Sequence, residues 1–223
     1  MIQIKNLNKL FNETKKNEFH ALRDINLEIK TNSCVILKGI SGSGKSTLLS
    51  ILATLSKPTS GEIIIDNEAI AKLPDIHASN FRANKIGFIF QSYNLFNELN
   101  VEQNVNIPLV PLNLSTKELN EKTNKALKLA NISHKKNELV YNLSGGEKQR
   151  CAIARALVNN PDIILCDEPT ANLDLENSKK FIEVLKELKQ LNKTIIVATH
   201  DPIFDDLDFV DKVVNISNGK ICE

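Results

Sequence analysis

One nine-residue segment constrains the fold of this chain more than any other. It reads Gly39-Ile40-Ser41-Gly42-Ser43-Gly44-Lys45-Ser46-Thr47, and it lies between a short apolar run, Cys34–Leu37, and an apolar helix start, Leu48–Leu52. Glycines let a backbone wrap so that successive N–H groups point at one anion, and the following helix adds its positive end. A strand, a glycine-rich loop and a helix in this order predict the phosphate-binding loop of a nucleotide-binding protein.

Two side chains of this loop have predicted roles in binding ATP and Mg²⁺. Lys45, which we expect to be exposed, is placed to neutralise the β- and γ-phosphates, and the Ser46 hydroxyl can ligate Mg²⁺. The alternative is a glycine-rich turn that arose by coincidence. Three of the eight glycines in the chain lie in this segment, and the strand and helix around it favour nucleotide binding.

Short apolar runs rich in β-branched residues recur along the chain and predict buried strands. They are Cys34–Leu37, Ile63–Ile65, Ile86–Phe90, Ile163–Cys166, Ile195–Ala198 and Val213–Ile216. Helices are predicted after the capping-box sequence Ser115–Glu118 and from Asn177 to Leu191. The stretch 92–160 lacks a convincing buried strand, so we expect a mostly helical lobe inserted into an α/β core made of residues 1–91 and 161–223.

Two carboxylates end the apolar run Ile163–Cys166. Asp167, at the strand tip, is placed to hold Mg²⁺ directly or through water. Glu168 points to the other side of the backbone and is a candidate general base for the attacking water. A solvated acidic turn before Pro169 is the alternative, which the phosphate loop upstream makes the weaker one.

Composition excludes several classes of protein. Lys and Arg number 28 against 27 Asp and Glu, so the net charge of +1 gives no basic excess for binding nucleic acid. The sequence contains no run of about 18 apolar residues, the length that a membrane-spanning helix needs. Its N-terminus lacks a secretory signal pattern. The four cysteines show no metal spacing, which favours reduced thiols in the cytosol. At 223 residues the chain fits one domain.

A second helix start distinguishes this chain from recombinases, helicases and small GTPases, which also carry phosphate loops. It reads Leu143-Ser144-Gly145-Gly146-Glu147-Lys148-Gln149-Arg150 and opens an apolar helix. Small residues at a helix N-terminus form a further anion site from backbone N–H groups, whereas one ATP needs only one phosphate loop. An ordinary capped helix explains Ser144 but leaves Gly145 and Gly146 unexplained.

This segment resembles the signature of the ABC ATPases, and the chain is similar to that family from end to end. The resemblance implies an α/β P-loop NTPase core with a mostly parallel sheet, an N-terminal antiparallel β portion and an inserted helical subdomain. These parts would form a single domain over 1–223 that hydrolyses ATP.

The resemblance also implies further site residues. Gln91 matches the loop glutamine that senses Mg²⁺ and the γ-phosphate, and His200 matches the switch histidine that reaches the γ-phosphate. Asp174, in Ala171-Asn172-Leu173-Asp174, matches a loop aspartate that contacts the opposite subunit. Phe11 lies where the family places an aromatic that stacks on adenine, although a lone aromatic can also be a core residue.

In the family, two ATPase subunits pair head to tail. Ser144, Gly145 and Gly146 of one chain would cap the ATP held by the phosphate loop of the other. This chain carries one ATPase set, so a second copy or a close relative must supply the other half of a homodimer or heterodimer. The ATP-driven cycle of closing and opening would drive a separate integral-membrane permease from the inner face of the cell membrane.

Three segments resemble the branch of lipoprotein-release and macrolide-export ATPases: Asn12–His20, Lys57–Glu62 and Ile86–Gln91. The chain departs from that branch at Asn97, where proline is common, and at Glu147-Lys148, where glutamines are common. Residues 92–111 are expected to form much of the dock for the permease, so these departures leave the partner and cargo open.

Other classes of ABC-type machine differ from this chain in the arrangement of their ATPase motifs. DNA-repair and chromosome-structure ATPases separate Lys45 and Asp167 equivalents by a long coiled coil, which is absent from this sequence. Translation-factor types carry two ATPase sets in one chain, and this chain has one. The remaining alternative is the ATPase of a cell-division complex that regulates cell-wall hydrolases without transport.

Overall fold

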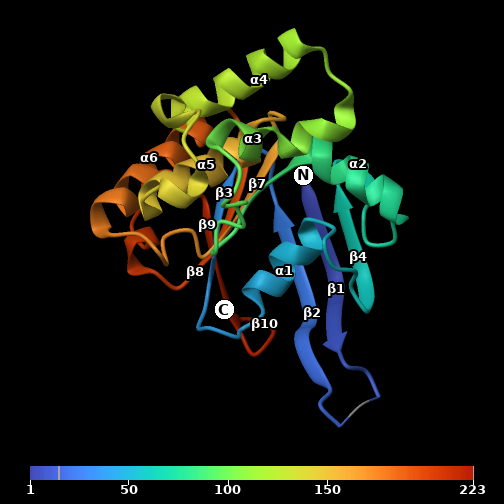
Figure 1. Ribbon diagram of the computed structural model, residues 1–223. Helices are drawn as coiled ribbons and strands as arrows, with labels where there is room; N and C mark the ends of the chain where they lie inside the picture. The colour runs from blue at the N-terminus through green and yellow to red at the C-terminus, as the bar shows by residue number, and fades with distance from the viewer. Residues whose placement is uncertain (15, 223) are drawn as a thin grey trace.

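The computed structural model describes residues 1–14 and 16–222, and within them the strands form two sheets (Figure 1). The first sheet is antiparallel, with the order β2-β1-β4-β5. Its strands are β1 (Ile2–Phe11), β2 (Phe19–Ile29), β4 (Ser60–Ile65) and β5 (Glu68–Ala69). This sheet confirms the expected N-terminal antiparallel portion, and its β1–β2 hairpin projects from the body of the molecule.

The second sheet has the order β10-β9-β3-β8-β7-β6 and is parallel except for β10. Its strands are β3 (Cys34–Lys38), β6 (Ile86–Ile89), β7 (Ile163–Asp167), β8 (Thr194–Thr199), β9 (Lys212–Ser217) and β10 (Lys220–Cys222). The mostly parallel sheet is therefore confirmed. Because parallel strands point the same way, the loops after β3, β6, β7 and β8 meet at one edge of the sheet.

Both faces of the parallel sheet are buried. Alternate residues along one strand point to opposite faces, so Ile36 of β3 joins one apolar cluster and Leu37 joins another. The same alternation places Cys166 in the first cluster and Leu165 in the second. This explains why the central strands are almost uninterrupted apolar runs in the sequence.

The helices divide between the two clusters. Helix α1 (Lys45–Leu52) contributes to the cluster that also holds the antiparallel sheet, whereas α3 (Val101–Asn106), α4 (Thr116–Leu129), α5 (Gly145–Leu157) and α6 (Leu175–Gln190) contribute to the other. Figure 1 shows these four helices gathered on one side of the parallel sheet. The remaining helices are α2 (Asp75–Lys85) and the 3₁₀ turns η1 (Ile107–Leu112), η2 (Ser133–Lys135), η3 (Val140–Asn142) and η4 (Pro202–Phe204).

Several local expectations hold, and some need correction. Two-residue turns at Asp66-Asn67 and Asn218-Gly219 join the antiparallel pairs β4–β5 and β9–β10, with positive φ at all four residues. Helix α4 follows Ser115 in a complete capping box. The strand expected over Ile86–Phe90 ends at Ile89, and α6 begins two residues before Asn177 because Asp174 caps it.

Residues 92–160 contain helices and no named strand among the described residues, although Asn100 and Leu139 form an isolated β-bridge. The boundaries at 92 and 160 remain a prediction. The Asn12–His20 segment includes Lys15, which lies outside the described residues, and its last two residues belong to β2.

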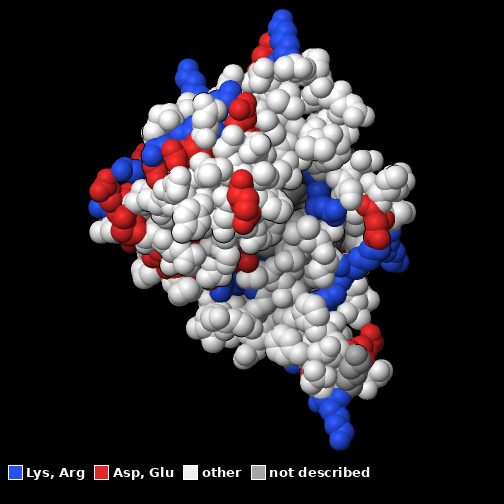
Figure 2. Space-filling view, in the orientation of Figure 1, with Lys and Arg blue, Asp and Glu red and all other residues white. Residues whose placement is uncertain are grey.

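Charges of both signs lie side by side on the surface. On α6, ion pairs join Lys180 to Glu176 and Lys186 to Asp208. The face shown in Figure 2 carries basic and acidic side chains together over the region of α6, while much of the rest of that face carries neither. Across the described residues, no helix is both long enough and apolar enough to cross a bilayer.

Candidate functional site

The phosphate loop lies between β3 and α1, at the edge where the parallel strands end. Gly44 is the N-cap of α1 with φ 109°, and a Cβ there would lie 2.6 Å from the carbonyl oxygen of Ala21, so only glycine fits. The first-turn N–H groups of a helix have no intrahelical partner, and here no side chain of the described residues caps them. The Ser43 hydroxyl is also buried and has no hydrogen-bond partner in the described chain. Unsatisfied polar groups of this kind fit a phosphate ligand.

A pocket of ≈ 220 Å³ lies beside the loop and contains most of the predicted site residues. Its lining comes from five separate parts of the sequence, which the topology brings to one place. The lining residues are Phe19, Ala21, Ser41, Gly42, Ser43, Gly44, Lys45, Ser46, Thr47, Gln91, Glu168 and His200. Gly39 and Ile40 lie at the start of the same loop, before the lining residues.

The expectation that Lys45 is exposed is wrong. Lys45 is only 4% exposed, and its ammonium donates to the carbonyl oxygens of Gly39 at 2.7 Å and Ile40 at 3.1 Å. Its Nζ also lies 3.4 Å from Glu168 Oε1. The loop wraps around its own lysine, so the charge is held beside the pocket rather than in solvent.

Asp167 and Ser46 meet where a metal ion would bind. The Ser46 hydroxyl donates to Asp167 Oδ1 at 2.7 Å. Burial raises the pKa of Asp167, with Glu168 acting in the same direction, while the Ser46 hydrogen bond and Lys45 oppose the shift. Among the described residues, no group of three or more His, Cys, Asp or Glu side chains could hold a metal alone. The donors fit Mg²⁺ as an ion that takes most of its ligands from phosphates and water.

Glu168 and His200 form a pair at the mouth of the pocket. His200 Nδ1 lies 3.0 Å from Glu168 Oε1, and the imidazole is 63% exposed. The Glu168 backbone has φ 43°, in the left-handed region that a residue with a side chain seldom adopts. Its N–H donates to the carbonyl oxygen of Ala198 on β8 at 2.8 Å. The strain is local to the predicted general base, which is where backbone strain often gathers in functional sites.

The loop after β6 is tied to the loop after β7. The Gln91 carbonyl oxygen accepts a hydrogen bond from Asn172 Nδ2 at 2.9 Å, and Tyr93 donates its hydroxyl to the Asn172 carbonyl oxygen at 3.3 Å. Gln91 therefore reaches the pocket from a loop anchored to the segment that follows Glu168. Asp174, at the end of that segment, accepts from the Asn177 N–H at 2.7 Å as the N-cap of α6.

Phe11 lies at the end of β1, and it is not among the residues that line the pocket. Its ring is 40% exposed, and Lys9 Nζ lies 4.8 Å from the ring centroid. Phe19, which pairs with Phe11 across the hairpin, does line the pocket. The sequence analysis missed Phe19. A signal for it was present, because Phe11 and Phe19 flank the same polar segment between two strands.

The signature residues begin α5 and do not line this pocket. Ser144 accepts from the Glu147 N–H at 3.4 Å, while Glu147 Oε2 accepts from the Ser144 N–H at 2.8 Å, so the two form a capping box. A Cβ on Gly146 would lie 2.5 Å from Asn177 Oδ1, which gives Gly146 a packing reason to be glycine. A Cβ on Gly145 would make only ordinary contacts, at 3.4 Å or more, so none of the described residues requires glycine there.

Comparison with known proteins gives relatives over the full chain. Residues 22–171 match the family described as ABC transporter. The lipoprotein-releasing system ATP-binding protein LolD of Pseudoalteromonas translucida is 38% identical over 222 residues, which cover 99% of this chain and 94% of LolD. The macrolide export ATP-binding/permease protein MacB of Neisseria meningitidis is 38% identical over 221 residues, which cover 99% of this chain and 34% of MacB.

A solved structure shares the whole fold. It is the dimeric, post-hydrolysis state of the ATP-binding cassette MJ0796 of Methanocaldococcus jannaschii, bound to ADP and Pi. It is 38% identical, covers 100% of this chain and 97% of its own, and has a TM-score of 0.91. The expected α/β ATPase fold is thereby confirmed. The chain belongs to the ABC transporter family as an ATP-binding protein, close to LolD, MacB and MJ0796.

Proposed function

We propose that this chain pairs head to tail with a second ATPase subunit when MgATP binds, and that the pair drives a separate integral-membrane permease from the inner face of the cell membrane. The observation that carries the proposal is the separation of two halves of a site. The phosphate loop, Gln91, Glu168 and His200 share one pocket, and residues 144–146 lie outside it. A second subunit is the natural source of the missing signature.

Each residue of the pocket has a part in this proposal. The backbone of residues 39–47 and Lys45 would hold the phosphates, and Ser46, Gln91 and Asp167 would hold Mg²⁺, which neutralises phosphate charge when bound. Glu168 would accept the proton of the attacking water. His200, which already contacts Glu168, would orient that carboxylate and reach the γ-phosphate.

The start of α5 suits a ligand that comes from outside the chain. Within the part of the chain that the structure describes, Gly145 has no contact that requires glycine, and Ser144 is exposed. Helix α5 presents its first-turn N–H groups there, which favour an anion. The relative MJ0796 is described as dimeric with ADP and Pi bound, which supports the same arrangement here.

A second, apolar groove supports the permease partner. It has a volume of ≈ 310 Å³, and residues from two stretches of the chain, 53–90 and 108–159, line it. Leu55, Phe88 and Phe90 contribute from the first stretch, and Pro108 and Pro111 from the second. The proposed dock therefore extends beyond the 92–111 stretch expected from the sequence. Apolar grooves of this kind accept an amphipathic helix of a partner.

The test is the variant Glu168→Gln, which keeps the shape of the side chain but cannot take a proton. We expect its ATP hydrolysis to fall by about 10²–10⁴-fold, the usual contribution of a general base. ATP then stays bound, so gel filtration with MgATP should show a dimer for the variant and mostly monomer for the parent. A Glu168→Gln protein that hydrolyses ATP at the parental rate would assign the base to another residue.

A further inference from the structure

One buried side chain joins the signature helix to the segment that carries Glu168. Gln149, in the second turn of α5, is 2% exposed, and its Nε2 donates to the carbonyl oxygen of Pro169 at 2.9 Å. Pro169 follows Glu168 directly in the sequence. The signature residues lie at the start of α5. The contact therefore links α5 to the turn that holds the proposed base.

Stability alone does not account for a glutamine at this position. The other oxygen of the same amide, Gln149 Oε1, is buried and has no hydrogen-bond partner in the described chain. A buried amide that is only half satisfied costs free energy, because its acceptor has lost water without gaining a partner. An apolar side chain of the same shape would avoid this cost, so the amide is retained for the one bond that it makes.

That bond acts on a strained turn. Glu168 has φ 43°, although a residue before proline favours extended backbone. Around it, the Glu168 N–H donates to Ala198 O at 2.8 Å and the Ala171 N–H donates to Glu168 O at 3.2 Å. A strained backbone conformation persists only where surrounding contacts stabilise it. The Gln149 hydrogen bond to Pro169 is such a contact on the C-terminal side of Glu168.

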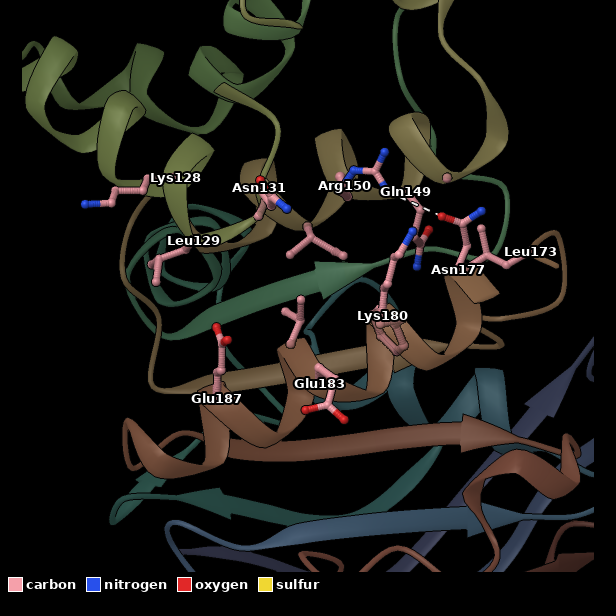
Figure 3. Close-up of a pocket in the computed structure, with 15 residues that line it drawn as sticks. Lys128, Leu129, Asn131, Gln149, Arg150, Leu173, Asn177, Lys180, Glu183 and Glu187 are labelled. Atoms are coloured by element: carbon pink, nitrogen blue, oxygen red, sulfur yellow. Dashed lines mark hydrogen bonds between the residues drawn. The ribbon is translucent and has the colours of Figure 1, made fainter. Parts of the chain in front are cut away.

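The next residue of α5 makes a parallel contact. Arg150 Nη1 donates to Asn177 Oδ1 at 3.4 Å, and Asn177 Nδ2 donates in turn to both carboxylate oxygens of Asp174, at 3.1 and 3.0 Å. Figure 3 shows Gln149, Arg150 and Asn177 together at one end of a pocket between α4, α5 and α6. The segment from Pro169 to Asp174 is thus held near both of its ends by adjacent residues of α5.

We propose that Gln149 is a positioning residue for Glu168, which sets the Glu168-Pro169 turn from the helix that carries the signature. The inference rests on the proposed function, in which the start of α5 contacts the nucleotide of the partner subunit. A shift of α5 on meeting that nucleotide moves Pro169 through Gln149, so the base in one ATP site responds to the nucleotide in the other. The role is one of placement, and Gln149 itself does not touch the reacting atoms.

The test compares Gln149→Met with the control Ile153→Val. Methionine keeps the length of the side chain but removes both the donor and the unpartnered oxygen, and these two losses have opposite effects on stability, so Tm should change little. The base loses its placement, and we expect kcat to fall on the order of ten-fold or more, since small misplacements of reacting groups cost that much. KM for ATP should stay at the parental value. Ile153 is buried in the same helix, and Ile153→Val should leave kcat unchanged.

A second measurement separates placement from binding. In a Glu168→Gln background, the ATP concentration that gives half-maximal dimerisation should be the same with Gln149 and with Gln149→Met. Gln149→Leu, which also lacks the donor, repeats the comparison should the methionine variant fold poorly. The parental chain is measured first, because a parent without ATP hydrolysis or ATP-dependent dimerisation would contradict the proposed function itself.

With the parent active, three results would overturn the inference. The first is a parental kcat in folded Gln149→Met and Gln149→Leu. The second is a fall of kcat in Ile153→Val equal to that in Gln149→Met. The third is a shift in the ATP concentration for half-maximal dimerisation that is large enough to explain the lost rate. A fall in kcat with unchanged KM, Tm and midpoint would support it.

Discussion

Phe11 and Phe19 face each other where β1 pairs with β2, and directly opposed residues of an antiparallel pair have their side chains on the same face. Phe19 also lines the pocket beside the phosphate loop. Base stacking requires an aromatic face and does not depend on a hydroxyl group, so the adenine ring can stack on either phenylalanine. At the scale of single residues, we therefore expect the adenine platform to be shared by both rings.

Replacing either phenylalanine by alanine should weaken ATP binding. Stacking of a base on one aromatic ring is worth about 1–3 kcal/mol, so the Kd should rise by roughly five- to 150-fold. Isothermal titration calorimetry with ATP measures this, with Phe96→Ala as the control because Phe96 is 54% exposed and lies outside the pocket. A parental Kd in Phe19→Ala would leave the platform to Phe11 alone.

Single residues also show what the sequence could predict about the site. The phosphate loop is one continuous segment, so its chemistry could be inferred from order and spacing. The burial of Lys45 could not, because it depends on the way the loop folds its carbonyl groups around the ammonium. The Gln149–Pro169 contact was equally out of reach, since it joins two elements whose packing no local pattern encodes.

At the scale of elements, the capping box at the start of α5 makes stability depend on pH. The Ser144 N–H bond to Glu147 lowers the pKa of that carboxyl; burial acts the other way, while the Ser144 hydroxyl and Lys135 reinforce the lowering. A carboxyl with a lowered pKa stabilises the fold above its unfolded pKa, and that stability is lost as pH falls through the folded value. The loss therefore falls in the window below pH 4.5, the ordinary pKa of the group.

Glu147→Gln keeps a side chain that can complete the capping box but removes its titration. We expect the urea midpoint of the parent to fall relative to that of Glu147→Gln as pH drops from about 6 to about 3, by less than ~1 kcal/mol of unfolding free energy because the carboxylate is only partly buried. Parallel midpoints for the two proteins over this range would contradict the assignment of the shift to Glu147.

Elements with a strong local pattern were predicted, and those without one were missed. The central strands are apolar on both faces and α4 has a full capping box, so both could be read from the sequence. Strand β1 alternates with polar residues and its pairing shifts register, and α2 buries only Ala78 and Phe81. Such elements gain their stability from neighbours, which a local pattern does not record.

At the scale of the whole molecule, the apolar groove predicts how a membrane partner is held. Leu55 is 50% exposed at the edge of that groove, so Leu55→Glu should place a charge against the partner's apolar surface. We expect the membrane protein that co-purifies in mild detergent to be lost, while ATP hydrolysis by the isolated chain is kept. Leu191→Glu is the control, since Leu191 is 52% exposed and lies outside the groove. Equal losses from both variants would contradict the placement of the dock.

The α/β core and the helical stretch within it could be predicted from the apolar patterns and the phosphate loop. The N-terminal antiparallel portion was implied only by the resemblance to the ABC ATPases. The proposed shared site was also implied only by that resemblance, because the groups that would complete it belong to a different chain. Gly145 fits this proposal, since among residues 1–14 and 16–222 no contact gives it a packing reason to be glycine.

The central claim is tested by mixing Lys45→Ala with Gly145→Asp. The first breaks the phosphate loop, and the second places a carboxylate where the γ-phosphate of the partner's ATP would lie. Because Lys45 is buried, Lys45→Ala is first shown to be folded by its thermal melt. Each variant alone should be inactive. In a head-to-tail heterodimer, one ATP site would contain both substitutions and the other ATP site would contain neither.

The measurement is ATP-dependent pairing of differently tagged variants, with phosphate release as the second readout. The shared-site account predicts that the mixture regains ATP-dependent pairing at one site per heterodimer and some phosphate release. If each signature instead served its own phosphate loop, no mixture could contain an intact site. Absence of both pairing and phosphate release, with crosslinking showing that the two variants can meet, would contradict the account.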